Sequence, residues 1–184
     1  MASRLSGIAV LLSLCVFSLP VLAQPAAPAN PISQAIRDGW TPAKTNFRRS
    51  ADVMPEAKYG FKPVDTVRSF GAILAHVAGA AYESCAAAKG EKPPHLEADF
   101  EKSATTKAAI VKALDGAIAY CDEAYKSMTD ARAAEMTAGA FGGPQGARAA
   151  NLIGNTIHFQ EHYGNLVTYL RINGLVPPSS APRQ

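Results

Sequence analysis

A pair of histidines near the C-terminus has the spacing of a metal-chelating motif. His158 and His162 are four residues apart, in a segment whose apolar residues repeat at helical spacing. At about 100° per residue, the two side chains point only about 40° apart, one turn above the other. Two imidazoles in that arrangement can bind one divalent ion.

A third histidine, His76, could supply the remaining nitrogen of a facial set. It lies midway along another amphipathic segment, at the edge of the apolar stripe that carries Ile73 and Val77. Three imidazoles leave a coordination position open for water or substrate, as in catalytic zinc sites. The spacing alone leaves a second interpretation open, in which each histidine is a core residue that hydrogen-bonds to a neighbour.

Other polar residues lie near this set on the same predicted helix. Asn155 and Tyr169 project within about 60° of His158, and we expect Asn155 to bond an imidazole ring and fix its tautomer. Glu161 points about 60° away from His158, which makes it a weak candidate for a general base. A solvated position on the helix surface is the other interpretation of Glu161.

Four long amphipathic helices are predicted to carry these residues. Apolar residues recur at three- and four-residue spacing over 32–54, 69–89, 103–128 and 147–173. An alternating strand pattern is absent from the sequence, so the fold class is all-α, a four-helix bundle. The segment 91–101, which contains Pro93 and Pro94, is predicted to be a loop. The long connection over 90–102 permits, but does not require, the second and third helices to lie parallel.

The predicted helix ends rest on a few residues. Ser69 and Ser103 can cap the second and third helices with their side-chain oxygens, and Gly90 can adopt the left-handed conformation that ends the second. Pro42 lies inside the first segment and lacks an amide hydrogen. We expect either a kink there or a new helix start with Thr41 as its cap.

The N-terminus has the order of a secretory signal. A basic residue, Arg4, precedes an apolar run over 8–22, and the small residue Ala23 follows it. Residues 1–23 are therefore predicted to be removed, which makes the protein periplasmic or secreted. The Pro- and Ala-rich segment 24–31 is predicted to be a flexible linker.

The remaining 161 of the 184 residues suffice for one domain, predicted over 32–178 with a C-terminal tail at 179–184. Removing Arg4 lowers the formal charge from +3 to +2, and the remaining basic residues are interspersed with acidic ones. This pattern argues against nucleic acid as a partner. After removal of the signal, no segment is apolar enough to predict a membrane span.

The chain resembles the DinB-like superfamily over about 34–180, and three groups of residues carry the resemblance. They are Met-Pro at 54–55 with Tyr59-x-Phe61-x-Pro63, then Arg68-Ser-Phe-Gly-x-Ile-Leu-Ala-His76-Val-Ala, then His158-Phe-Gln-Glu-His162-Tyr-Gly-Asn-Leu-x-x-Tyr169-Leu-Arg171-x-x-Gly174-x-Val-Pro-Pro178. The resemblance implies an up-down-down-up bundle with a crossover between the second and third helices. It also implies one divalent ion bound by His76, His158 and His162.

The resemblance says less about the reaction than about the fold. The family's thiol transferases and isomerases use low-molecular-weight thiols of the cytoplasm, whereas this chain begins with a predicted export signal.

The mature chain has two cysteines, Cys85 and Cys121, and an oxidising compartment permits a disulfide. Cys85 lies sixteen residues past Ser69, and Cys121 lies eighteen past Ser103. If the second and third helices are parallel, as the family topology implies, both cysteines reach the same level and we expect them to be bonded. An antiparallel arrangement would separate them beyond the reach of roughly 7 Å between α-carbons.

The expected function is that of a metal-dependent hydrolase or transferase of the cell envelope, acting on an unknown small-molecule substrate. Zinc and nickel suit an imidazole site best, and we expect the ion to face a pocket bordered by Ala80, Asn155 and Tyr169. The alternative is a non-enzymatic metal-binding or interaction scaffold. A clear acid or base beside the histidines would separate the two, and the sequence offers only Glu161. A homodimer is an assembly that the sequence leaves open.

Overall fold

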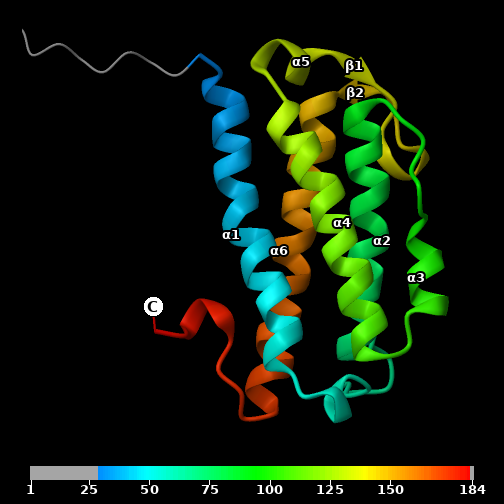
Figure 1. The fold of residues 1–184 in the computed structure, drawn as a ribbon, viewed down its shortest axis with the longest axis vertical. Coiled ribbons are helices and arrows are strands. Elements are labelled where there is room, and N and C mark those ends of the chain that lie inside the picture. Colours follow the sequence, from blue (N-terminus) through cyan, green and yellow to red (C-terminus); the bar gives the residue numbers. More distant parts are fainter. Residues whose placement is uncertain (1–28, 183–184) are drawn as a thin grey trace, which may run out of the picture.

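Four long helices form the body of the protein (Figure 1). The computed structural model describes residues 29–182, and its long helices are α1 Pro31–Val53, α2 Phe70–Lys89, α4 Lys107–Ser127 and α6 Arg148–Ile172. Their positions agree with the apolar repeats of the sequence. The predicted all-helical fold class is confirmed.

Short elements connect the long helices. They are η1 Glu56–Lys58, α3 Glu97–Ser103, α5 Asp130–Ala134, β1 Met136–Thr137, η2 Ala140–Gly142, β2 Gly146–Ala147 and, after α6, η3 Pro178–Ser180. The two short strands pair antiparallel, with Met136 opposite Ala147. In Figure 1, α3 lies outside the four long helices and beside α2.

Contacts between α2 and α4 show that the two helices run in the same direction. Near their starts, a Cβ added at Gly71 would lie 3.1 Å from Cδ1 of Ile110. Near their ends, Cys85 and Cys121 form a disulfide, with their α-carbons 5.3 Å apart. The structure therefore contains the predicted disulfide, and the long connection returns the chain along the bundle.

The last helix runs opposite to α2. At one end of the pair, Nη1 of Arg148 donates to the carbonyl of Ala88 over 2.9 Å. At the other end, the hydroxyl of Tyr169 donates to the carbonyl of Arg68, also over 2.9 Å. These contacts hold the facing sides of α2 and α6 in register.

Aromatic side chains fill the core between α1, α4 and α6. Trp40 stacks on Tyr125 with ring centroids 4.7 Å apart, and it meets Phe159 edge to face with centroids 4.8 Å apart. Phe47 lies 5.0 Å from Phe159, and all four rings are buried. Burial of this apolar surface holds α1 against the rest of the bundle.

The ends of α2 confirm two predictions. The Ser69 side chain accepts a hydrogen bond from the amide of Ala72, and Gly90 adopts φ 77° at the C-terminus. The expectation of a new helix start at Pro42 is wrong, because α1 is continuous from Pro31 to Val53. The Thr41 hydroxyl donates back to the carbonyl of Arg37.

Two predictions about the crossover connection are wrong. The segment read as a loop contains α3, which begins after Leu96, whose amide donates to the Asp99 carboxylate over 2.8 Å. Ser103 ends α3 and does not cap the next helix. Thr106 is the cap of α4, and its hydroxyl accepts from the amide of Ala109.

The predicted signal at 1–23 lies outside the described residues, as does most of the linker predicted at 24–31. None of the described helices is long and apolar enough to span a membrane.

Candidate metal centre

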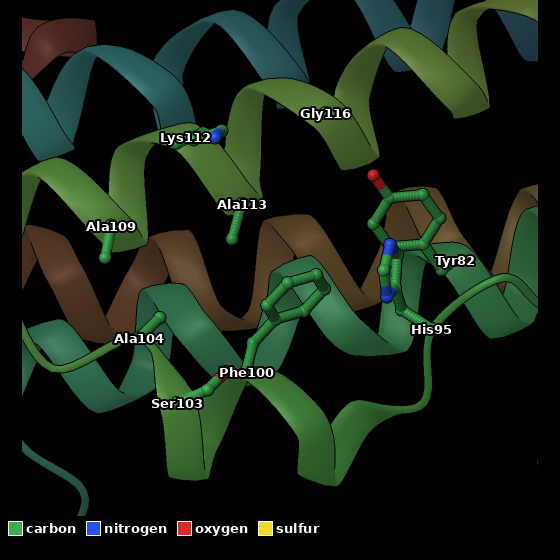
Figure 2. A pocket seen from close by; sticks show the side chains of 9 residues that line it. All are labelled: Tyr82, His95, Phe100, Ser103, Ala104, Ala109, Lys112, Ala113 and Gly116. Atoms are coloured by element: carbon green, nitrogen blue, oxygen red, sulfur yellow. The ribbon is translucent and has the colours of Figure 1, made fainter.

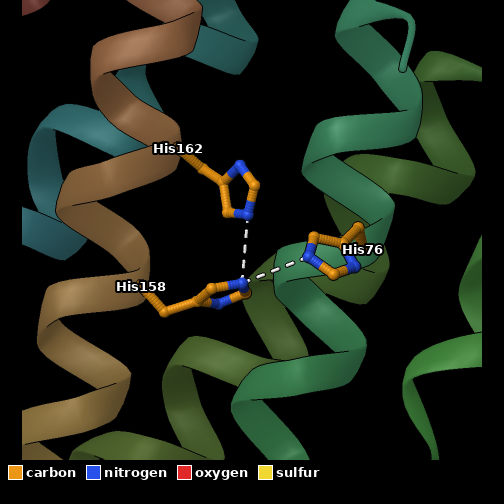
Figure 3. A group of neighbouring side chains, drawn as sticks. All are labelled: His76, His158 and His162. Atoms are coloured by element: carbon orange, nitrogen blue, oxygen red, sulfur yellow. Dashed lines mark hydrogen bonds between the residues drawn. The ribbon is translucent and has the colours of Figure 1, made fainter. Parts of the chain in front are cut away.

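Three imidazole rings converge between α2 and α6 (Figure 3). Nε2 of His158 lies 3.1 Å from Nε2 of His76 and 3.0 Å from Nε2 of His162. The rings meet edge to face, with centroids 4.5–5.0 Å apart. His76 is buried, and the two histidines of α6 are partly exposed. The structure thus brings together the three residues that sequence spacing and resemblance selected.

The packing of α6 fixes the direction of its two histidines. Phe159 and Leu166 are fully buried on the core side, and Tyr163 is nearly so. The Tyr163 hydroxyl donates to the Ser179 hydroxyl over 2.7 Å, which joins α6 to the C-terminal segment. Because that face of α6 is held in the core, the adjacent face presents His158 and, one turn later, His162 to α2.

The contacts of His158 cannot both be aligned hydrogen bonds. Its Nε2 is within hydrogen-bond distance of Nε2 of both His76 and His162. A neutral imidazole nitrogen has either one proton to donate or one lone pair to accept, so a linear bond satisfies only one of the two contacts. A cation among the three nitrogens would satisfy all three lone pairs.

Two carboxylates approach the opposite side of the His76 ring. Oε1 of Glu97 lies 2.9 Å from Nδ1 of His76, and Oε1 of Glu101 lies 3.2 Å from it. Both distances are those of an ion pair, but neither oxygen has the alignment of a hydrogen bond, so Nδ1 is buried without a bonded partner. Nε of Arg68 donates to Glu101 over 3.0 Å.

The residues on both sides of His76 give two groups that could hold a metal ion. One is the three histidines, and the other is His76 with Glu97 and Glu101. Glu97 and Glu101 were missed from the sequence because 91–101 was read as a loop. Their four-residue spacing, the same as that of the histidine pair, is the signal that could have identified them.

Burial keeps the histidines of α6 uncharged. Burial first, and then the charges of His162 and His76, lower the pKa of His158 to about 4. Burial is also the main cause that lowers the pKa of His162, followed by the charge of His76. Neutral imidazoles are the form that binds metal, so at neutral pH His158 and His162 can bind without losing protons.

A sequence profile of the DinB superfamily matches residues 40–165, which is more than half of the chain. The chain belongs to the DinB superfamily. No curated protein matches the sequence.

Solved structures share the DinB fold at low sequence identity. A DinB-like protein from Bacillus cereus is 16% identical, with a TM-score of 0.67 over 79% of this chain and 95% of that one. A putative DinB family member from Exiguobacterium sibiricum is 18% identical, with a TM-score of 0.59 over 77% of this chain and 91% of that one.

A mycothiol-dependent maleylpyruvate isomerase is similar over part of its length. It is 16% identical with a TM-score of 0.61, over 73% of this chain and 60% of the isomerase. At these identities, the likeness shows the shared DinB fold and no more.

In this DinB chain, Asn155 does not contact the histidines as predicted. Its Nδ2 donates to the Tyr125 hydroxyl over 3.2 Å, and its Oδ1 is buried with no bonded partner among the described residues. The helical angle correctly predicted that Asn155 faces the interior of the bundle, but its side chain bonds to Tyr125 of α4 and not to a histidine. The Tyr169 hydroxyl donates to the Arg68 carbonyl, and Tyr169 lines the same cavity as His162.

Cavities adjoin the histidines of α6 on two sides. One of about 450 Å³ contacts His158 and Glu161 and is covered by the segment 139–144. The other, of about 350 Å³, contacts His162, Arg68 and Tyr169. The predicted border of the pocket is wrong for Ala80 and Asn155, because both side chains are buried in the core and line neither cavity, but Tyr169 does line the second cavity beside His162.

A third cavity, of about 400 Å³, lies between α3 and α4 (Figure 2). Tyr82, His95 and Phe100 line one wall, and Ala109, Lys112, Ala113 and Gly116 of α4 line the other. The His95 ring packs against Tyr82 at 4.9 Å and against Phe100 at 5.0 Å. These aromatic contacts hold α3 to α2 and keep His95 away from the metal centre.

Proposed function

We propose that this DinB protein binds one divalent metal ion through Nε2 of His76, His158 and His162. Tetrahedral coordination at metal–nitrogen distances of about 2.0–2.1 Å places ligand nitrogens about 3.3 Å apart. The distances of 3.1 Å and 3.0 Å between these nitrogens are close to that value. This convergence of three lone pairs is the observation that carries the proposal.

Zinc and nickel are the ions that we propose for the site. Neutral imidazole is a good ligand for both, and the lowered pKa values of His158 and His162 keep these two ligands neutral. Among the described residues, no fourth side chain is grouped with the three histidines as a possible ligand. Cys85 and Cys121 are not candidates, because they are bonded to each other.

The open side of the centre supports an enzymatic role, as a hydrolase or transferase acting on an unknown small molecule. A divalent ion with an open position acts as a Lewis acid that polarises a carbonyl or phosphoryl oxygen. The cavities beside His158 and His162 give such a molecule two approaches to the site. Glu161 borders the first cavity and is the candidate base there, and Arg68 borders the second and can attract an anionic group.

We also propose that the protein is exported. The N-terminal sequence has the order of a signal, and the Cys85–Cys121 disulfide is typical of oxidising compartments. Fusion of residues 1–30 to a reporter that is active only outside the cytoplasm tests the signal. A reporter that stays inactive, with the fusion retained at full length in the cytoplasm, would contradict export.

Elemental analysis of the purified mature protein tests the metal site. The expected result is about one zinc or nickel ion per chain, lost in His76→Ala, His158→Ala and His162→Ala and retained in His95→Ala. His95 is the matched control, because it is the histidine that lies outside the centre. Wild-type protein that binds no metal after incubation with zinc and nickel would overturn the proposal.

Kinetic screening separates an enzyme from a scaffold. Metal-dependent turnover of small ester, amide or thiol-acceptor substrates, lost in His158→Ala, would support the enzyme. A metal-loaded protein whose cobalt-substituted form does not respond to azide or imidazole has no open position, which would favour the non-enzymatic scaffold.

A further inference from the structure

The short helix α3 is held unusually close to α2. The closest approach is at Gly79, where an added Cβ would lie 2.7 Å from the carbonyl oxygen and 2.9 Å from the carbonyl carbon of Glu97. Distances below 3.0 Å to backbone atoms leave no room for a methyl group. Glycine at position 79 therefore lets the backbone of α3 lie directly on α2, one turn beyond His76.

The start of α3 is fixed by further contacts. The amide of Glu97 donates to a carboxylate oxygen of Glu83 on α2 over 2.7 Å. On the other face of the helix, Phe100 packs against Tyr82 and His95, as Figure 2 shows. A helix of seven residues is marginal by itself, so these contacts determine its position.

Docked in this way, α3 directs two carboxylates at one buried nitrogen. Glu97 and Glu101 are one turn apart, and their Oε1 atoms lie 2.9 Å and 3.2 Å from Nδ1 of His76. His76 is only 8% exposed, and its Nδ1 has no aligned partner. Since Nε2 of the same ring faces His158, a metal at Nε2 requires the proton to be on Nδ1.

We propose that Glu97, supported by Glu101, is a positioning residue for the metal, accepting the Nδ1 proton of His76 and thereby fixing its tautomer and orientation. The proposal rests on the three-histidine site proposed above. A carboxylate behind a ligating histidine also raises its basicity, and loss of such a partner weakens metal binding about 10- to 100-fold. Nε of Arg68 donates to Glu101 from the outside, which holds that carboxylate beside His76.

The test measures zinc affinity by competition with a chelator in wild type, Glu97→Gln, Glu101→Gln and the double variant. We expect the double variant to bind about 10- to 100-fold more weakly, and each single variant to lose less because the other carboxylate remains. Glu123→Gln, an exposed carboxylate on α4, is the control for net charge and should bind as wild type does. Circular dichroism and thermal unfolding verify that each variant is folded.

A spectroscopic readout separates positioning from a general structural effect. In cobalt-substituted protein, the exchangeable Nδ1 proton of each ligating histidine gives a paramagnetically shifted NMR signal. The signal of His76 should shift and exchange faster with solvent in the double variant, while those of His158 and His162 keep their positions.

A glycine pair tests the docking of α3 without altering any charge. Gly79→Ala should displace α3 and weaken zinc binding, whereas Gly164→Ala on α6 meets open space and should leave it unchanged. Both changes favour helix formation by themselves, so a difference between them reports on α3.

Three results would overturn the proposal. Wild-type protein that binds no metal removes the proposed function and this inference together. Metal binding in wild type with unchanged affinity and an unchanged His76 signal in the double variant removes the inference alone. A second equivalent of metal that disappears in the double variant would show that His76, Glu97 and Glu101 bind a cation of their own.

Discussion

The ring of Trp40 on α1 lies flat against the ring of Tyr125 on α4, with an interplanar angle of 5°. Trp40 also donates from Nε1 to the Asp122 carboxylate over 2.7 Å. It is the single tryptophan of the chain, so its fluorescence reports directly on the contact between the first helix and the rest of the bundle.

Replacing Tyr125 by phenylalanine should destabilise the fold by about 1–3 kcal/mol. The buried Tyr125 hydroxyl donates to the Leu152 carbonyl over 2.7 Å and accepts from Asn155, and both would lose a partner. Urea unfolding, followed by Trp40 fluorescence, measures the free energy of unfolding. Tyr120→Phe, which affects only an exposed contact with Glu91, should change it by less than about 0.5 kcal/mol. Equal losses in the two variants would contradict the assigned role of Tyr125.

The metal-free protein should lose stability as the pH falls from about 6.5 toward 4. The folded-state pKa of His158 is lowered from 6.5 to about 4, chiefly by burial. Between these two pKa values the unfolded chain binds a proton at His158 and the folded chain does not. The contribution of neutral His158 to folding stability is therefore complete above pH 6.5 and is lost as the pH falls toward 4. Thermal unfolding in chelator across this range should show a shallower pH dependence in His158→Asn. An identical dependence in both proteins would refute this assignment.

Removal of the metal should leave the bundle folded. Buried aromatic and aliphatic side chains hold the four long helices without help from the centre, unlike small domains that fold only with zinc. We expect a chelator to lower the melting temperature while the far-ultraviolet circular dichroism at 25 °C stays the same. Unfolding of the protein by chelator at 25 °C would mean that the ion is structural.

Loss of the disulfide should destabilise the protein by about 3–4 kcal/mol, because Cys85 and Cys121 close a loop with a sequence separation of 36. The double variant Cys85→Ser/Cys121→Ser should show this loss in urea unfolding. Addition of a reductant should then destabilise wild type but not the variant. Wild-type protein that is insensitive to a reductant under unfolding conditions would argue against the bond.

Two glycines should respond oppositely to alanine. A Cβ at Gly71 would lie 3.1–3.2 Å from atoms of Ile110 and Tyr59, and the crowding should cost about 1–3 kcal/mol. A Cβ at Gly39 in α1 meets only Thr156 at 3.9 Å, so Gly39→Ala should stabilise by about 0.5–1 kcal/mol. Thermal unfolding of the two variants is the measurement, and changes of the same sign would be the contrary result.

The sequence predicted the features that repeat along a single helix. The apolar period located α1, α2, α4 and α6, and the angle between His158 and His162 follows from helical geometry alone. Ser69 and Gly90 marked helix ends because each has a local backbone role that does not depend on the rest of the fold.

The features that were missed depend on contacts between elements. The seven residues of α3 make less than two turns, too few to show a period, and α3 is held by the approach of Glu97 to Gly79. The role of Asn155 was predicted wrongly because its partner, Tyr125, belongs to a different helix. Ser103 was predicted wrongly as the cap of α4 because it belongs to α3, which the sequence pattern does not reveal. The cap is Thr106.

The position of α3 within the connection from α2 to α4 has a consequence for how the protein can diversify. The connection must be long because the two helices it joins are parallel, and it therefore has room for a segment that reaches the back of His76. This segment also contributes Phe100 and Ala104 to the core, so substitutions that keep these two side chains can alter the surroundings of His76 without disturbing the long helices. Relatives with the same three histidines could in this way differ in metal affinity through a stretch of chain that contributes no ligand at all.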